Sequence, residues 1–192
     1  MRRMPVSCPG RAEGFTLLEL ILVIAIISIM SAFAVPAFSS LYGDICLKRA
    51  VLEIKGMFKD AKLLSIQDKP CAILFDPAEG RASLYSGRGP DDKWDTGDET
   101  LVSELDISEM GGALSFGYGD RGPVRNPRQL AKTDDGVAFQ YNRFASDEGI
   151  VGKAGSVYIQ SASSGGAAAL VFNSVDFSCS IYKWDGKDWI EM

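Results

Sequence analysis

The chain has 192 residues, enough for one domain with a modest hydrophobic core. Its 20 lysines and arginines against 25 aspartates and glutamates give a net charge of -5, which argues against a broad basic surface for nucleic acid. The sequence contains no histidine, so the commonest general base and the commonest metal ligand are both missing, which argues against a hydrolase.

The N-terminal region combines basic residues with a long apolar run. Arg2, Arg3 and Arg11 precede a segment without charge, Leu20 to Phe38. As a helix this segment reaches roughly 28 Å, close to the thickness of a bilayer core. Because positively charged flanks stay on the cytoplasmic side, we predict a single transmembrane helix with the rest of the chain exported.

Glu19 immediately precedes this apolar run. An ionised carboxylate in hydrocarbon costs several kcal/mol unless it is paired, so Glu19 needs a partner. The segment from Gly14 to Glu19 reads Gly-Phe-Thr-Leu-Leu-Glu. This segment resembles the prepilin cleavage motif of type IV pilins and type II secretion pseudopilins.

The resemblance implies a defined processing route. In that family a prepilin peptidase cuts after the glycine and methylates the new amine, which here means cleavage between Gly14 and Phe15 and N-methylation of Phe15. Glu19 would then serve assembly by pairing with the cationic N-terminus of a neighbouring subunit. Pro36 falls where the family often has a helix-kinking proline. The expected partners are other pilin or pseudopilin subunits, the prepilin peptidase and the inner-membrane assembly platform.

Two other interpretations of this region are open. An ordinary secretory signal would use Ala32-Phe33-Ala34 as its cleavage site. A plain single-pass anchor would make the prepilin motif fortuitous. The secretory signal leaves unexplained both Glu19 and the helical pattern that continues after the apolar run.

An amphipathic helix follows the apolar segment. Leu47, Val51, Ile54, Phe58 and Ala61 recur at intervals of four and three. With no Gly-Pro break before them, we predict one helix from Phe15 to Gln67, ended by Lys69-Pro70. The predicted organisation is a cleaved leader over 1–14, a transmembrane half of the helix over 15–38, an amphipathic half over 39–69 and a β-rich head over 70–192.

The head contains short runs typical of strands, each bounded by turn residues. Asp185-Gly186 indicates a tight hairpin near the end, and the stretches Ser86 to Thr100 and Gly117 to Asp135 are predicted loops. The fold class is therefore α+β: one long N-terminal helix packed on a mostly antiparallel, pilin-like β head. The predicted strands are Cys71–Phe75, Arg81–Tyr85, Ala113–Tyr118, Val137–Asn142, Ser156–Ser161, Ala168–Phe172, Phe177–Trp184 and Lys187–Ile190.

Few residues suggest chemistry. The acidic stretch Asp91–Glu99 offers oxygen ligands for calcium but lacks EF-hand spacing, so a solvated loop is the favoured interpretation. A disulfide between Cys71 and Cys179 would tie the first strand to a late one, and buried free thiols are the alternative. No catalytic constellation is recognised, so we expect neither an enzyme nor a cofactor.

The strand pattern of the head is similar to the GspH/FimT group of minor pseudopilins and minor pilins. This resemblance implies a minor pseudopilin of a type II secretion pseudopilus, which exports proteins across the outer membrane, with its helix in the inner membrane and its head in the periplasm. The alternative is a minor pilin of a type IV pilus, for assembly, adhesion or DNA uptake. No nucleic-acid partner is expected, although Arg121, Arg125 and Arg128 form a local basic cluster. An exported enzyme is the least favoured hypothesis.

Overall fold

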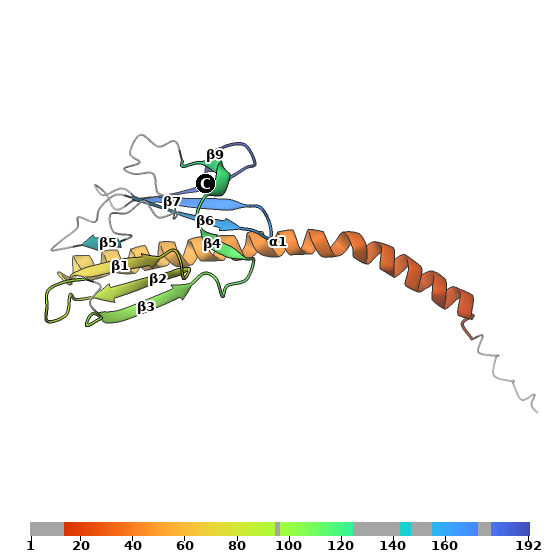
Figure 1. Ribbon diagram of the computed structural model, residues 1–192, viewed down its shortest axis with the longest axis horizontal. Helices are drawn as coiled ribbons and strands as arrows, with labels where there is room; N and C mark the ends of the chain where they lie inside the picture. The colour runs from red at the N-terminus through yellow and green to blue at the C-terminus, as the bar shows by residue number, and fades with distance from the viewer. Residues whose placement is uncertain (1–13, 95–96, 125–142, 147–154, 173–177) are drawn as a thin grey trace, which may run out of the picture. The chain divides into compact units, whose positions relative to one another are not determined.

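The structure is a computed structural model that describes residues 14–94, 97–124, 143–146, 155–172 and 178–192 (Figure 1). It divides into two compact units, Met1–Ala37 and Phe38–Met192. One α-helix, α1 (Leu17–Ile66), contributes residues to both units. The predicted helix is confirmed, although it begins two residues later and ends one residue earlier than expected.

The end of α1 shows why the helix stops where it does. Asp68 adopts a left-handed conformation with φ of 55°. The amide of Asp68 donates to the carbonyl of Ser65, and the amide of Lys69 donates to the carbonyl of Leu64. These two bonds form the Schellman pattern that satisfies the last carbonyls of a helix. Pro70 follows and cannot continue the helix.

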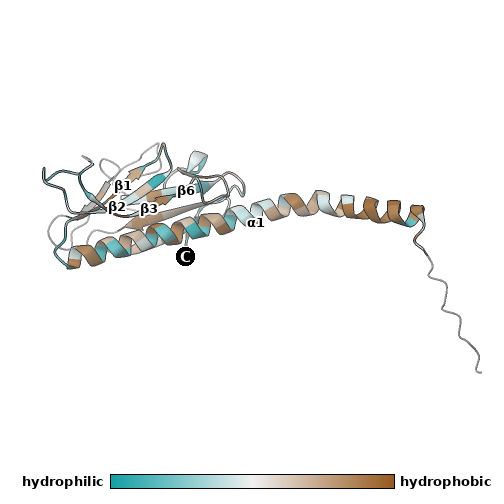
Figure 2. Cartoon of the chain, turned by 90° about the horizontal axis from the view of Figure 1, so that it is seen from below, coloured by the Kyte–Doolittle hydropathy of each residue, from teal (hydrophilic) through white to brown (hydrophobic). Residues whose placement is uncertain are grey.

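In the first unit, α1 is apolar around its circumference apart from Glu19 at its start and the serines Ser28 and Ser31 (Figure 2). Its large side chains are exposed from Leu17 through Val35, and Pro36 lies inside the helix. Among the described residues, α1 is the one helix that is long and apolar enough to cross a membrane. The length and composition of the segment therefore agree with the predicted membrane anchor.

In the second unit, one face of α1 packs against two antiparallel sheets. The first sheet has the order β3-β2-β1-β5 and the second the order β4-β6-β7-β8-β9, with every described pair antiparallel. A 3-10 helix, η1 (Gly119–Arg121), follows β4. The strands are β1 (Cys71–Asp76), β2 (Arg81–Ser86), β3 (Thr100–Asp106), β4 (Leu114–Phe116), β5 (Arg143–Ser146), β6 (Gly155–Ser161), β7 (Ala167–Phe172), β8 (Cys179–Trp184) and β9 (Trp189–Glu191).

Seven of the predicted strands are found within a few residues of their predicted limits, as β1, β2, β4, β6, β7, β8 and β9. The predicted strand Val137–Asn142 lies outside the described residues. Two strands, β3 and β5, were not predicted. The turn between β8 and β9 is longer than the two-residue turn predicted, because Trp184 pairs with Trp189. Asp185 closes that turn by accepting hydrogen bonds from the amides of Asp188 and Lys187, which hold the pKa of its carboxyl below its usual range.

Phe58 of α1 joins the helix to both sheets. Its ring stacks on that of Phe172 from the second sheet and meets that of Phe144 from the first sheet edge-on, with ring centroids 4.8 Å apart in the latter pair. Phe75 of β1 lies 6.3 Å away, again between ring centroids. Aromatic contacts of this kind add to the free energy gained from burying the rings. The core is therefore one cluster shared by α1 and both sheets.

The opposite face of the second sheet has its own small cluster. Tyr158 and Ala169 alternate with core residues along β6 and β7, so their side chains point away from α1. The segment Gly117–Val124 covers them. Arg121 fastens this segment by donating to the carbonyl of Gly165 at 2.7 Å, and the indole of Trp189 donates to the carbonyl of Gly122 at 3.1 Å. This face of the sheet is thus sealed by the chain itself.

A close contact fixes α1 against the loops at its entry into the head. A Cβ placed on Gly43 would lie 2.8 Å from Ser161 Oγ and 3.0 Å from the Ser164 amide. Gly112 approaches from the facing loop, and its own Cβ would lie 2.9 Å from that of Cys46. Ser161 Oγ also donates to the carbonyl of Gly112 at 2.7 Å. Gly43, which the sequence showed only as a lone glycine in a helix, is therefore required by packing.

We expect Gly43→Ala to destabilise the protein by about 1 to 3 kcal/mol, because the added methyl overpacks this contact. The measurement is thermal unfolding of the full-length chain in detergent. The matched control is Gly56→Ala on the same helix, where an added Cβ meets nothing within 4 Å among the described residues. That control should stabilise the protein by about 1 kcal/mol through helix propensity alone. Equal effects of the two substitutions would contradict the packing argument.

Candidate assembly surface

The first turn of α1 is closed by a reciprocal pair of side chains. Glu19 Oε2 accepts hydrogen bonds from the backbone amide and the hydroxyl of Thr16, each at 2.9 Å. In return, the amide of Glu19 donates to Thr16 Oγ1 at 3.2 Å. This is a capping box, in which the residue before the helix and the third residue of the helix satisfy each other's backbone donors.

The capping box gives Glu19 a partner within its own chain. From the sequence we expect a partner for Glu19 in a neighbouring subunit, and the structure places one, Thr16, in the same chain. The sequence does contain a pattern that predicts this pairing, since Thr and Glu three residues apart before an apolar run are typical of a capping box. The carboxylate is therefore held beside the start of the helix, close to Phe15.

The predicted cleavage site lies immediately before this turn. Gly14 and Phe15 are outside the helix, and the Phe15 side chain is 86% exposed. A Cβ on Gly14 would meet nothing within 4 Å among the described residues, so packing of those residues does not require glycine there. Residues 1–13 of the predicted leader lie outside the described residues.

The outer face of α1 in the second unit carries an apolar stripe, here called the outer stripe: Leu41, Ile45, Leu52, Leu63 and Ile66. These side chains are between 53% and 59% exposed. On a helix of 3.6 residues per turn they lie opposite the buried face that contains Ala50 and Ile54. The amphipathic half predicted from sequence thus has a second apolar side, which the analysis of the core-facing pattern missed.

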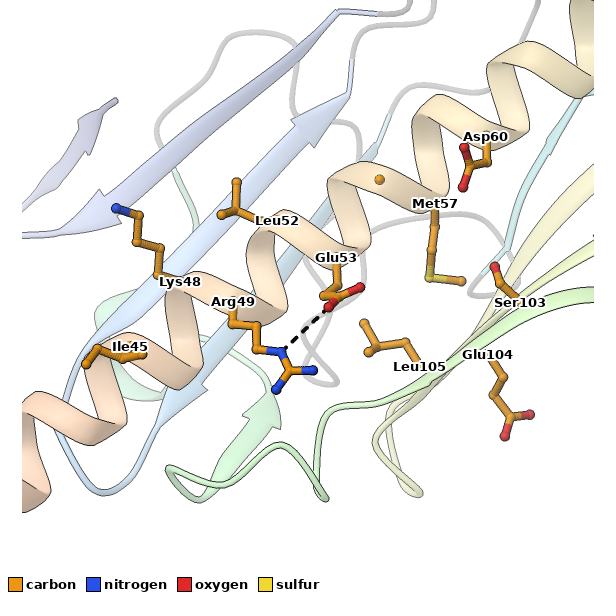
Figure 3. A pocket seen from close by; sticks show the side chains of 11 residues that line it. Ile45, Lys48, Arg49, Leu52, Glu53, Met57, Asp60, Ser103, Glu104 and Leu105 are labelled. Carbon is orange, nitrogen blue, oxygen red and sulfur yellow. Dashed lines mark ion pairs between the residues drawn. The ribbon is translucent and has the colours of Figure 1, made fainter.

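Grooves flank the outer stripe on both sides. One lies between α1 and β3 and is lined by Leu52, Met57 and Leu105, with the Arg49–Glu53 ion pair of 3.6 Å on its wall (Figure 3). The other lies between α1 and the strands of the second sheet, where Ile181 and Met192 line it. Ile45 and Leu52 border both grooves. Together the stripe and the grooves form a largely apolar surface.

The described cysteines are free thiols in this structure, and the possible bridge between Cys71 and Cys179 stays a prediction. None of the described cysteines, Cys46, Cys71 and Cys179, is joined in a disulfide. Cys71 lies on β1 in the first sheet and donates to the carbonyl of Ala61 at 3.1 Å, whereas Cys179 lies on β8 in the second sheet. Burial raises the pKa of the Cys179 thiol from 9.0 to about 11, against a small opposing effect of the Lys55 charge.

The acidic stretch 91–99 does not assemble a metal site in the part of the chain that the structure describes, where no group of three or more His, Cys, Asp or Glu side chains could hold an ion. Asp92 pairs with Arg88 at 3.1 Å, and Asp91 accepts from the amide of Lys93. Asp95 lies outside the described residues. Of the basic cluster, Arg121 is engaged in fastening its loop, and Arg125 and Arg128 lie outside the described residues.

The comparisons with known proteins agree with the geometry of the N-terminus. A family model described as the prokaryotic N-terminal methylation motif matches residues 10–35. A type IV major fimbrial protein FimA of Dichelobacter nodosus is 32% identical over 123 residues, which cover 57% of this chain and 71% of that protein. The chain belongs to the type IV pilin family.

Two further FimA proteins of Dichelobacter nodosus, one from strain VCS1703A, are 39% identical to this pilin-like chain over 71 residues. These alignments cover 35% of this chain and 41% of each relative, so the chain spans about two fifths of their length. No solved structure gives a significant match. The prepilin interpretation of the N-terminal segment and the pilin-like α+β fold are thus confirmed.

We expect Thr16→Val to weaken the first turn of α1 by about 1 kcal/mol, because it removes the hydroxyl of the capping box. Amide hydrogen exchange of the N-terminal peptide, measured on the protein in detergent, should become about fivefold faster. Thr16→Ser keeps the hydroxyl and is the control. Exchange that is equally fast in both variants, or unchanged in Thr16→Val, would show that the capping box does not stabilise the turn.

We expect the Cys179 thiol to resist alkylation in the native protein. With a pKa near 11 instead of 9.0, its thiolate fraction at pH 8 is about 100-fold lower than in the unfolded chain. The native rate should rise about tenfold per pH unit from pH 8 to 10, whereas the unfolded chain levels off near pH 9. Iodoacetamide labelling read by peptide mass checks this.

Denatured, unreduced protein should label at Cys71 and Cys179, and the absence of both labels would indicate the bridge.

Proposed function

We propose that this chain is a structural subunit of a pilin-like filament and not an enzyme. It is held in the inner membrane with its head in the periplasm, cut after Gly14, methylated at Phe15 and polymerised through α1. The observation that carries the proposal is the uncovered apolar surface of α1. That surface consists of the whole circumference of the helix in the first unit and the outer stripe with its grooves in the second.

The energetics of this surface favour assembly. Burying one Leu or Ile side chain contributes about 1.5 to 3 kcal/mol. Lipid covers such side chains only within a membrane, and the outer stripe belongs to the unit that also carries the polar head. A row of exposed apolar side chains on such a unit favours an interaction surface. Other subunits of the same kind would cover both parts of α1 outside the membrane.

Glu19 would direct the joining of subunits. In the single chain its carboxylate is held by Thr16. Cleavage after Gly14 creates a cationic amine at Phe15. Pairing of Glu19 with the amine of a neighbouring subunit would bring together two opposite charges, each of which is costly alone in an apolar environment. The peptidase and an inner-membrane assembly platform are the partners that this route requires.

For the kind of filament, we propose a type IV pilus-like fibre. The named relatives are major fimbrial proteins, and the alignment with one of them extends through much of its length. A minor pseudopilin of a type II secretion pseudopilus is the second candidate. It is favoured by the closing strands β6 to β9, which follow the order on which the likeness to the GspH/FimT group rests.

The processing step can be tested by intact mass and N-terminal peptide analysis of the protein from membranes, with and without an active prepilin peptidase. We expect a chain beginning at N-methyl-Phe15 only when the peptidase is present. A start near Val35, or an uncut chain in both strains, would reject the proposal in favour of a secretory signal or a plain anchor.

Glu19→Ala tests the assembly step separately. We expect normal cleavage and methylation but loss of incorporation into sheared filaments, because the carboxylate is needed between subunits and not by the peptidase. Glu19→Asp keeps the charge on a shorter side chain and should restore part of the incorporation. Filaments that contain Glu19→Ala at the wild-type level would remove this residue from the assembly mechanism. Co-purification with secretion or pilus components then distinguishes the two kinds of filament.

A further inference from the structure

β3 is a free edge of the first sheet and forms one wall of the groove between α1 and β3. It ends the strand order β3-β2-β1-β5, and Figure 1 shows it at the border of that sheet. The amide of Ile107 donates to the carbonyl of Gly80. Because bonding alternates from residue to residue in an antiparallel pair, the backbone groups of Glu104 and Asp106 point away from β2. Among the described residues no strand pairs with them.

The side chains of β3 alternate between the groove and the opposite face. Leu105 lines the groove together with Leu52 and Met57 of α1. Figure 3 shows Ser103 and Leu105 pointing toward α1, and Glu104 pointing away from it. A strand added beyond β3 would continue this alternation, with one row of side chains against α1 and the other row beside Glu104.

Two features of the groove indicate space for such a strand. Ser103 Oγ is shielded from solvent and has no hydrogen-bond partner in the described part of the chain. Gly56 lines the groove from α1, and a Cβ there would meet nothing within 4 Å among the described residues. Glycine in a helix interior is less favourable than alanine, so its position calls for a reason. A side chain of an added strand would fill the gap over Gly56 and reach Ser103.

The charges beside the groove define the chemistry of the added strand. Glu53 is paired with Arg49 at 3.6 Å, whereas Glu104 and Asp60 have no ion pair among the described residues. Opposite charges that face each other across neighbouring strands are stabilising, and like charges are destabilising. A basic side chain beside Glu104 is therefore favoured, and an acidic one is disfavoured.

We propose that the edge of β3 and this groove bind an extended segment of another protein, in which apolar residues alternate with lysine or arginine. Its backbone pairs with Glu104 and Asp106, its apolar side chains cover Leu52 and Leu105, and its basic side chains lie on the face of Glu104. This mode of recognition is strand addition to a sheet edge. The inference goes beyond the proposed filament function and concerns a subunit whose groove no neighbour covers.

The dimensions set the length of the segment. The lining residues of α1 extend from Ile45 to Asp60, about 22 Å along the helix, which corresponds to about six or seven residues of extended chain. A register shift opposite Leu84 and Tyr85 interrupts β3, so its regular part is short. Backbone pairing therefore covers only part of the segment, and side chains must supply the rest of the affinity.

The first test uses a labelled peptide of alternating valine and lysine, about seven residues long, with the full-length chain in neutral detergent. Fluorescence polarisation measures binding. N-methylation of one set of residues, either the valines or the lysines, should weaken binding roughly tenfold or more, because only one set of amides faces β3. The same change on the other set should leave binding intact. Equal effects of the two changes, or no binding by the unmodified peptide, would overturn strand addition.

Variants of the chain locate the site. Gly56→Leu fills the groove and should weaken binding of the valine-lysine peptide roughly tenfold. Glu104→Lys should weaken it as well and should favour a valine-glutamate peptide instead. Lys59→Leu lies outside the groove lining and is the control, with unchanged binding expected. Wild-type affinity in both Gly56→Leu and Glu104→Lys would place the peptide elsewhere and overturn the proposal.

Incorporation into sheared filaments separates this inference from the proposed function. We expect Glu104→Lys to lose peptide binding and still enter filaments at the wild-type level. Loss of both would indicate a second copy of the chain as the occupant and overturn its assignment to another protein. A wild-type chain that binds the peptide but never enters filaments would reject the filament proposal and leave the peptide site intact.

Discussion

Both sheets of the head depend on one face of α1. Phe58 touches aromatic rings from each sheet, and the buried residues of the helix belong to the same cluster as those of the strands. A helix that contributes one face to a core leaves the other to solvent. Here that other face carries the outer stripe among charged residues such as Arg49 and Glu53, so the element that organises the fold also leaves apolar side chains uncovered.

The helix could be predicted from sequence almost to the residue, because its signals are local: an uncharged run, a period of three and four, and a terminating Lys-Pro pair. Most strands could be predicted for the same reason. β3 could not, since it begins with exposed residues on both of its faces and shows no clear alternation. The division into two sheets depends on pairings between distant strands, and turn residues carry no information on such pairings.

The candidate site also has one part that local sequence patterns predict and one part that depends on contacts between distant residues. The prepilin motif and Glu19 are contiguous in sequence, and the capping box that joins Thr16 to Glu19 is also a local pattern. The two grooves could not be predicted from a local pattern. Each is formed by α1 together with a strand more than forty residues away in the chain. The meaning of Gly43 and Gly56 likewise appears only when their surroundings are known: one glycine is enclosed and the other is open.

The cover over the outer face of the second sheet has a consequence for where subunits can meet. Arg121 and Trp189 hold the segment Gly117–Val124 against Tyr158, so this face offers a polar loop instead of bare sheet. Tyr158 and Ala169 are therefore not available for burial against another molecule. In a filament of the proposed kind, subunits would therefore meet through α1 and its grooves, and the covered face of the second sheet would stay in contact with water.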